Sequence, residues 1–328
     1  MKVIKQIIKN AIKNPKTIIF PEASFSGRII KAAKKIQKKG IAKVVLVGDE
    51  SSLVMQDKNL KNFIIINPKT CEYKDVLAEE LYQLRKDKGL NLEQAKQLIL
   101  DPFYFSTMLV VTGYADGMVC GAEVSTAQSL KPALQLLRQS DSFVNSYFLM
   151  CGKNKLTDEA FFLADCGLVE NPTSQQLAEI AKRVVSQSNL LTTNEPKVAF
   201  LSYSTHGSAK SESVEKVQNA YKIFIEENPN IKAVGEIQLD AALLPNVAKT
   251  KLKFGEPIGS SNILIFPEIN SANIGYKAIS YFGNLYALGP ITVGLKKPVN
   301  DLSRGCTVKD IIYITALTVI QCQQSEEK

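Results

Sequence analysis

Short apolar runs alternate with amphipathic segments along nearly the whole chain, and this alternation constrains the fold more than any other feature. Several runs, such as residues 18–20 (IIF) and 44–48 (VVLVG), are apolar throughout. Such runs are typical of parallel strands that are buried on both faces. We expect strands at 17–20, 43–48, 63–67, 116–121, 143–150, 160–165, 197–202, 231–237, 262–267 and 290–295.

Helical spacing follows most of these strands, which favours an α/β fold with right-handed crossovers. The first residues, MKVIKQIIKNAIKN, also have apolar positions at helical spacing and lack the features of a signal peptide. The strands can form one wide sheet or two smaller ones, and a polar stretch near 140–155 predicts a break. The other expected helices are 26–39, 74–88, 91–100, 125–139, 174–190, 211–226, 271–282 and 308–323.

The basic composition has two interpretations. The chain has 328 residues, 45% of them hydrophobic, which suits one large domain or two ordinary ones, and a net charge of +8. The charge is compatible with an anionic partner such as nucleic acid, a membrane surface or a phosphorylated metabolite. However, most lysines lie on polar helix faces, as in residues 31–40, and no basic stretch alternates with aromatic residues. We therefore expect neither nucleic-acid nor membrane binding.

Cysteine and histidine usage argues against a metal centre. The six cysteines form no C-x-x-C pair, and the chain has a single histidine. Zinc sites need several such ligands at short spacing. Scattered thiols in apolar segments are typical of a protein in a reducing cytoplasm.

Three strand-to-helix corners combine serine or threonine with glycine and a nearby cation. They lie at residues 120–131, 201–213 and 300–310. Ligands of α/β sheets bind beyond the carboxyl ends of strands, where helix N-termini attract anions. The corners therefore resemble phosphate sites. Taken one at a time they are better explained by helix capping, because Ser125 with Gln128 fits S-x-x-Q and Thr307 with Asp310 fits T-x-x-D.

The third corner contains an unusual cation. Arginine is rare in this chain, yet Arg304 lies between Ser303 and Gly305, just before an expected helix. The dinucleotide fingerprint, the P-loop and the nucleophile elbow are absent. A Ser-His-Asp triad would need His206, which we interpret as a polar loop residue. A carboxylate is therefore the expected general base.

Several segments resemble the phosphate acetyltransferase (phosphotransacetylase) family in order and spacing, over essentially the whole chain. They include KPVNDLSRGCTVKDI, VSTAQSLKPALQ, LADCGLVENPTSQQLAEIA, LSYSTHGSAKS and NILIFPEINSANIGYK. The stretch PVNDLSRG is the most discriminating. The related phosphate butyryltransferases have a looser version of these motifs.

The resemblance implies the reaction acetyl phosphate + CoA ⇌ acetyl-CoA + phosphate, a role in acetate metabolism, and coenzyme A as a substrate with no permanently bound cofactor or metal. It also implies two α/β/α domains with mainly parallel sheets, an isocitrate dehydrogenase-like architecture with the active cleft between the domains, and a cytoplasmic homodimer. The expected domains are residues 1–145 with 297–328, and residues 146–296.

The resemblance also implies roles for individual residues. Asp310 takes the place of the proposed base for the CoA thiol, while Arg304 and Ser303 orient and stabilise the reacting groups. Arg85 matches an arginine implicated in CoA binding. Lys131 departs from the family, which usually has arginine at that position, and His206 stands where lysine is common. The expected substrate-binding residues are Arg85, Lys131, Ser125, Thr126, Ser204, Thr205 and Asn300.

Elementary chemistry sets a condition on the base. Full proton transfer from a thiol near pKa 8.5 to an aspartate near 3.9 would cost about 6 kcal/mol. A helix start should lower the pKa of Asp310 further, so burial or thiolate stabilisation by Arg304 must compensate. Cys306 is a rival nucleophile without a histidine nearby in sequence, and direct attack by CoA is favoured. A phosphate butyryltransferase and an inactive phosphate or CoA-binding protein remain alternatives.

Overall fold

The computed structural model describes residues 1–139, 143–152, 160–252 and 258–326. Part of the polar break expected near 140–155 lies outside the described residues. The chain divides into two compact units. We call residues 7–144 with 294–328 the terminal unit, and residues 1–6 with 145–293 the middle unit. The first helix, α1, spans Lys2–Lys13.

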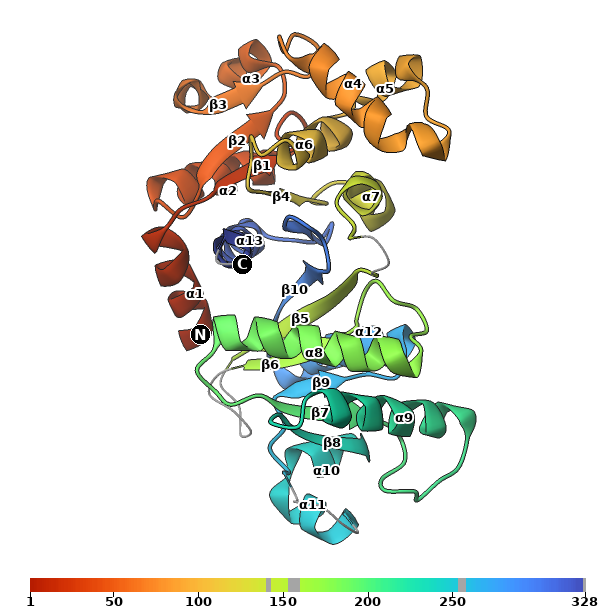
Figure 1. The fold of residues 1–328 in the computed structure, drawn as a ribbon. Coiled ribbons are helices and arrows are strands. Elements are labelled where there is room, and N and C mark those ends of the chain that lie inside the picture. The colour runs from red at the N-terminus through yellow and green to blue at the C-terminus, as the bar shows by residue number, and fades with distance from the viewer. Residues whose placement is uncertain (140–142, 153–159, 253–257, 327–328) are drawn as a thin grey trace. The chain divides into compact units, whose positions relative to one another are not determined.

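The terminal unit is built on a parallel sheet whose described strands have the order β11-β4-β1-β2-β3 (Figure 1). The central strands are almost completely buried, as their continuous apolar runs predict. The sheet consists of β1 (Thr17–Phe20), β2 (Lys43–Val47), β3 (Ile64–Ile66), β4 (Gly117–Cys120) and β11 (Val299–Asp301).

Helices cover both faces of this sheet. On one face α2 (Gly27–Lys38) and α13 (Val308–Glu326) contact each other and the sheet, and on the other α6 (Pro102–Val111) contacts α7 (Thr126–Leu136). The remaining helical segments are α3 (Glu50–Gln56), η1 (Lys58–Asn62), α4 (Lys74–Arg85), η2 (Lys86–Lys88) and α5 (Leu92–Leu98).

The middle unit contains a mixed sheet with the strand order β10-β5-β6-β9-β7-β8 among the described residues. The pairs β10–β5 and β5–β6 are antiparallel and the others are parallel. Its strands are β5 (Asn145–Cys151), β6 (Ala160–Ala164), β7 (Lys197–Leu201), β8 (Lys232–Ile237), β9 (Ile263–Ile265) and β10 (Tyr286–Val293). Its helices are α8 (Ser174–Leu191), α9 (Glu212–Glu227), α10 (Leu239–Leu243), α11 (Pro245–Lys251) and α12 (Ile269–Gly283).

The predicted α/β class with mainly parallel sheets is confirmed, and the differences have identifiable physical causes. Helix α6 was not expected because its sequence, PFYFSTMLVV, is apolar on every side and shows no amphipathic spacing. Strand β11 has only three residues and one apolar side chain, so its pairing with β4 defines it. The last expected strand, 290–295, is observed at 286–293. Among the described residues no helix combines the length and hydrophobicity needed to cross a membrane.

Candidate active site

Residues 303–307, which we call the terminal turn, connect β11 to α13. The turn is closed by a hydrogen bond of 2.8 Å from the backbone N–H of Cys306 to the carbonyl oxygen of Ser303. The hydroxyl of Ser303 accepts a hydrogen bond from the N–H of Gly305 at 3.3 Å. Ser303 and Arg304 are both exposed, so the turn offers a hydroxyl and a permanent cation to a ligand.

Asp310 lies in the first turn of α13 and is half-buried. Its carboxylate accepts a hydrogen bond of 2.6 Å from the backbone N–H of Thr307. The backbone N–H of Asp310 in turn donates to the Thr307 hydroxyl at 3.3 Å. The T-x-x-D capping interpretation is therefore confirmed. Burial raises the pKa of Asp310, and the Thr307 N–H opposes this only in part. Burial therefore outweighs the opposing effect expected of the helix start, which is one of the two ways in which the sequence analysis allows Asp310 to act as a base.

Arg28, near the start of α2, connects the terminal turn to the loop between β4 and α7. One guanidinium nitrogen, Nη1, donates to the carbonyl oxygens of Arg304 at 2.8 Å and Cys306 at 2.7 Å. The other, Nη2, donates to the carbonyl oxygen of Ala122 and forms an ion pair of 3.0 Å with Glu123. Two segments that are far apart in the sequence are therefore attached to one side chain.

Cys306 is buried beneath this contact, with 6% of its surface exposed. Its sulfur lies 3.6 Å from Nη1 of Arg28. Burial raises the pKa of the Cys306 thiol even though the charge of Arg28 acts in the opposite direction. The thiolate form that a nucleophile requires is therefore disfavoured.

Asp301, at the end of β11, fixes the start of α7. Its buried carboxylate accepts hydrogen bonds from the hydroxyl groups of Thr126, at 2.6 Å, and of Ser129. Burial raises its pKa to about 6, although both hydroxyl groups act against this. Gly121 makes room for the carboxylate, because a Cβ atom there would lie 1.9 Å from an oxygen of Asp301. Ser125 caps α7 through a 3.4 Å contact with the N–H of Gln128, so its capping role is also confirmed.

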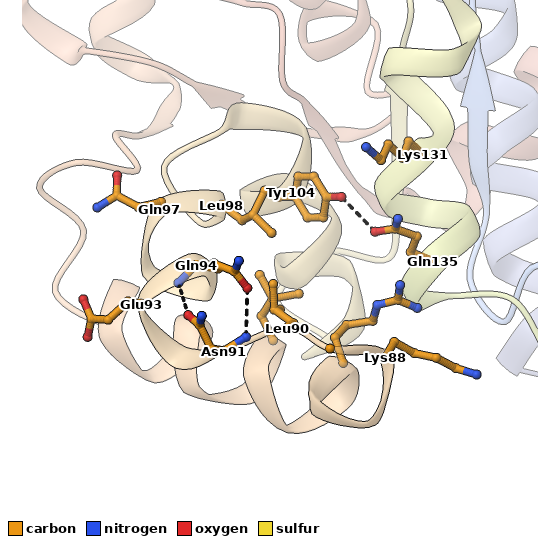
Figure 2. Close-up of a pocket in the computed structure, with 13 residues that line it drawn as sticks. Lys88, Leu90, Asn91, Glu93, Gln94, Gln97, Leu98, Tyr104, Lys131 and Gln135 are labelled. Atoms are coloured by element: carbon orange, nitrogen blue, oxygen red, sulfur yellow. Dashed lines mark hydrogen bonds between the residues drawn. The ribbon is translucent and has the colours of Figure 1, made fainter.

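Arg85 and Lys131, both predicted to bind substrate, line one cavity of about 690 Å³ between α4, α5, α6 and α7. Lys88 lines the same cavity and adds a third cation. Figure 2 shows Lys131 on α7 next to Tyr104, whose hydroxyl donates to Gln135 at 2.8 Å. The cations and the amide and hydroxyl groups make this cavity suitable for an anionic, hydrogen-bonding ligand.

Asn300 lies on the opposite side of the sheet from Asp301. Successive residues of a strand face opposite sides, so Asn300 faces α13 while Asp301 faces α7. Its fully buried side-chain amide donates to Thr318 at 2.9 Å and Gln321 at 2.7 Å. These contacts attach α13 to β11, and substrate binding by Asn300 stays a prediction.

Ser204 and Thr205 lie in a loop after β7 of the middle unit and are buried. The hydroxyl of Ser204 donates to Glu236 at 2.6 Å, and that of Thr205 accepts from the N–H of Gln238 at 3.0 Å. Burial opposes ionisation of Glu236, but hydrogen bonds from Ser204, Gly207 and Gln218 together hold its pKa below the usual value. His206 is also buried, at a positive φ of 46°. These contacts organise the loop, and substrate binding by Ser204 and Thr205 stays a prediction.

The sequence did not single out several residues that shape the site. Arg28 is one of the few arginines of the chain, which is a signal that could have been used. Asp301 lies inside the most discriminating motif, and Lys88 follows Arg85 by three residues. The described residues contain no cluster of three or more His, Cys, Asp or Glu side chains that could hold a metal ion.

Comparison with known proteins places this geometry in a family. The profile of the family described as "Phosphate acetyl/butaryl transferase" matches residues 2–319. A phosphate acetyltransferase of Acetivibrio thermocellus is 45% identical over 329 residues, covering 98% of this chain and 99% of the relative. The solved structure of a Streptococcus pyogenes phosphotransacetylase has a TM-score of 0.90 at 35% identity, covering 100% of this chain and 99% of the other. The EutD phosphotransacetylase of Staphylococcus aureus has a TM-score of 0.88 at 35% identity, with 98% of each chain covered. The chain therefore belongs to the phosphate acetyl/butaryl transferase family.

Proposed function

We propose that the protein is a phosphate acetyltransferase, which transfers an acetyl group reversibly between acetyl phosphate and coenzyme A. Family membership and the names of the full-length relatives support the reaction class. The observation that supports the chemistry most directly is the terminal turn. It presents an exposed hydroxyl and an exposed guanidinium immediately before a half-buried carboxylate of raised pKa.

Asp310 is the general base in this proposal. The carboxylate accepts the proton of the CoA thiol as the sulfur attacks the acetyl carbon. Because burial raises the pKa of Asp310, the difference from the thiol is smaller than between the free groups. A smaller difference lowers the cost of proton transfer and suits a base that works near neutral pH.

Arg304 and Ser303 stabilise the charge that develops during the transfer. The C–S bond forms, the C–O bond to phosphate breaks, and phosphate leaves with the bonding electron pair. The guanidinium of Arg304 carries a permanent charge, and the hydroxyl of Ser303 can donate a hydrogen bond to the acyl oxygen. The raised pKa of Cys306 favours direct attack by CoA over an acyl-enzyme.

The cavity lined by Arg85, Lys88 and Lys131 is the proposed site for phosphate groups of CoA. Arginine can bind phosphate oxygens in a bidentate manner, whereas the lysines supply point charges. Ser125 and Thr126, at the N-terminus of α7, are proposed to lie beside a phosphate at that helix start. We propose that the enzyme has no permanently bound cofactor. We also propose a cytoplasmic location, because all six cysteines are free and buried.

We also propose a homodimer. Helix α12 carries a large exposed apolar surface, since Ile274 is 68%, Tyr281 84% and Phe282 91% exposed. The adjoining strand β10 lies at the edge of its sheet. Exposed apolar patches of this kind are typical of subunit interfaces. Light scattering should show a dimer for the wild-type protein and a monomer for Phe282→Asp, and a monomeric wild-type protein would contradict the proposal.

The reaction is tested by mixing purified protein with CoA and acetyl phosphate and recording thioester absorbance. Butyryl phosphate in a parallel reaction measures the acyl-chain preference. We expect turnover with acetyl phosphate and a lower kcat/KM with butyryl phosphate. A preference for butyryl phosphate would make the protein a phosphate butyryltransferase. Binding of CoA without turnover of either substrate would identify an inactive binding protein.

A further inference from the structure

The guanidinium of Arg28 lies between two segments that hold candidate functional groups. Its contacts with the carbonyl oxygens of Arg304 and Cys306 involve the terminal turn. Its contacts with Ala122 and Glu123 involve the loop that leads into α7, the helix that carries Lys131. The segments are separated by about 180 residues in the sequence, so the contacts of Arg28 join parts of the chain that no local structure connects.

The same loop is held from a second direction. Glu22 is completely buried, and its carboxylate accepts hydrogen bonds of 2.9 Å from the backbone N–H groups of Ala122 and Glu123. Arg28 binds the carbonyl oxygen of Ala122, so both polar sides of this peptide segment are attached to charged side chains. The hydroxyl of Ser26 donates to Glu123 at 2.7 Å and accepts from the N–H of Ile29, which fixes the start of α2 and therefore Arg28.

This contact pattern requires arginine. The planar guanidinium directs N–H groups toward three carbonyl oxygens and one carboxylate at the same time. A lysine ammonium is a compact point charge and cannot span the same set. Most N–H groups of Arg28 are already engaged, which leaves little capacity for a substrate phosphate.

We propose that Arg28 is a positioning residue that holds the terminal turn and the start of α7 in their reactive register. The proposal rests on the proposed function, because it assigns the reacting groups to the terminal turn. Arg28 itself does not touch the substrates. Without it, Arg304 and Ser303 lose their fixed placement while the binding groups of the cavity between α4 and α7 remain.

Three variants test this role: Arg28→Ala, Arg28→Lys and, as a matched control, Arg138→Ala. Arg138 is an exposed arginine of the same unit. We expect Arg28→Ala to lower kcat on the order of 10²-fold, the effect of misplacing reacting groups by about 1 Å, with each KM within about threefold of wild type. Arg28→Lys should restore only part of kcat. Millimolar guanidinium should partly rescue Arg28→Ala and leave Arg138→Ala at wild-type activity.

A second readout does not depend on activity. Cys306 is 6% exposed beneath Arg28, so a thiol reagent followed by peptide mass spectrometry reports on the contact. We expect labelling of Cys306 to be at least about tenfold faster in Arg28→Ala and intermediate in Arg28→Lys, with labelling of Cys120 unchanged. Cys120 is a buried cysteine of the same unit and shows whether the fold as a whole has loosened.

The outcomes separate the alternatives. Unchanged kcat with unchanged Cys306 labelling in both Arg28 variants would overturn the proposal. A raised KM for either substrate with kcat preserved would instead identify Arg28 as a substrate-binding residue. Faster labelling of Cys120 together with Cys306 in Arg28→Lys would reduce Arg28 to a general stability role. If the wild-type protein shows no turnover, the proposed function fails, whereas the labelling comparison still tests whether Arg28 holds the turn.

Discussion

Two corners of this protein look alike in sequence and differ in structure. The terminal turn and the loop at residues 202–211 both combine serine, threonine and glycine with a nearby cation, and both precede a helix. In the terminal turn, Ser303 and Arg304 are exposed. In the other loop, Ser204 and Thr205 are buried and hydrogen-bonded to Glu236 and Gln238.

The nearby carboxylates explain the contrast. Burial raises the pKa values of Asp301 and Asp310 beside the terminal turn. For Asp301 the donors do not outweigh burial, to which the charge of Glu22 adds, and Asp310 has only the N–H of Thr307 against it. Glu236 receives hydrogen bonds from Ser204, Gly207 and Gln218, and its pKa is lowered despite burial. A carboxylate held with a raised pKa is suited to accept a proton near neutral pH, whereas one stabilised in its charged form suits a structural role. The same residue types can therefore leave a corner with exposed polar groups or engage those groups in hydrogen bonds within the protein.

The largest expected effect is that of Asp310→Asn. Loss of a general base typically lowers kcat by about 10²–10⁴-fold, and neither KM should change comparably. In the wild type, kcat should fall as the pH drops through the raised pKa of Asp310, because only the carboxylate accepts the thiol proton. The variant should lack this acidic limb. Wild-type turnover of the variant across pH 6–9 would leave Asp310 as a helix cap only.

Lys131→Ala tests whether the cavity between α4 and α7 binds the phosphate groups of CoA, as proposed. A charge-assisted hydrogen bond contributes about 1.5–3 kcal/mol, so one KM should rise roughly 10–150-fold with a smaller change in kcat. Lys131→Arg should preserve or improve that KM, since the guanidinium can bind two oxygens. Steady-state kinetics with both substrates measure this, with Lys88→Ala as a matched comparison in the same cavity. Unchanged KM values in Lys131→Ala would remove this lysine from the site.

Asp301→Asn tests how the raised pKa of a carboxylate beside the terminal turn affects the stability of the protein. The pKa of Asp301 is about 6 in the folded protein and near 3.9 in an unfolded chain. Its stabilising contribution is therefore complete below pH 4 and is lost as the pH rises through about 6. Between pH 4 and 7 the wild type should lose about 1–3 kcal/mol of unfolding free energy relative to the variant. Urea denaturation at a series of pH values measures this, and a pH-independent difference would contradict it.

The stability of Ser204→Ala should have the opposite pH dependence. Removing the hydroxyl deprives Glu236 of one donor, and a lost partner of a buried charged group destabilises by about 1–3 kcal/mol. Because the folded pKa of Glu236 is lowered, its contribution is present above its unfolded pKa and disappears as the pH falls through the folded value. Thermal unfolding should therefore show a larger deficit at pH 7 than at pH 4. A raised KM with unchanged stability would return Ser204 to the substrate site.

Cys306→Ala should have the smallest effect. The thiol is buried and its pKa is raised, so it should take no part in acyl transfer. We expect kcat within about threefold of wild type, a change that reflects packing around Arg28. An acetylated Cys306 trapped during turnover, together with near-complete loss of activity in the variant, would favour an acyl-enzyme route.

The sequence predicted the elements whose apolar residues recur at regular spacing. It missed elements that depend on contacts with distant parts of the chain. Most strands of both sheets and the longer amphipathic helices can be recognised, because apolar runs and amphipathic spacing are local signals. Helix α6 has no such contrast, since it is buried on every side. Strand β11 exists because it pairs with β4, and this pairing is what turns Asp301 toward α7 and Asn300 toward α13. The motif alone does not reveal that these two neighbouring residues face opposite sides of a strand, and substrate binding by Asn300 stays a prediction.

The α/β class, the capping motifs of α7 and α13 and the family resemblance could all be read from the sequence. These depend on residues close together in the chain or on motifs compared one at a time. Only the tertiary structure decided that Arg85, Lys88 and Lys131 line one cavity and that burial, rather than the helix start, sets the direction of the Asp310 pKa. It also decided that Arg28 holds the terminal turn. Both the burial of a carboxylate and the binding of several carbonyl oxygens by one arginine depend on which distant segments pack together. Local sequence patterns do not show which segments those are.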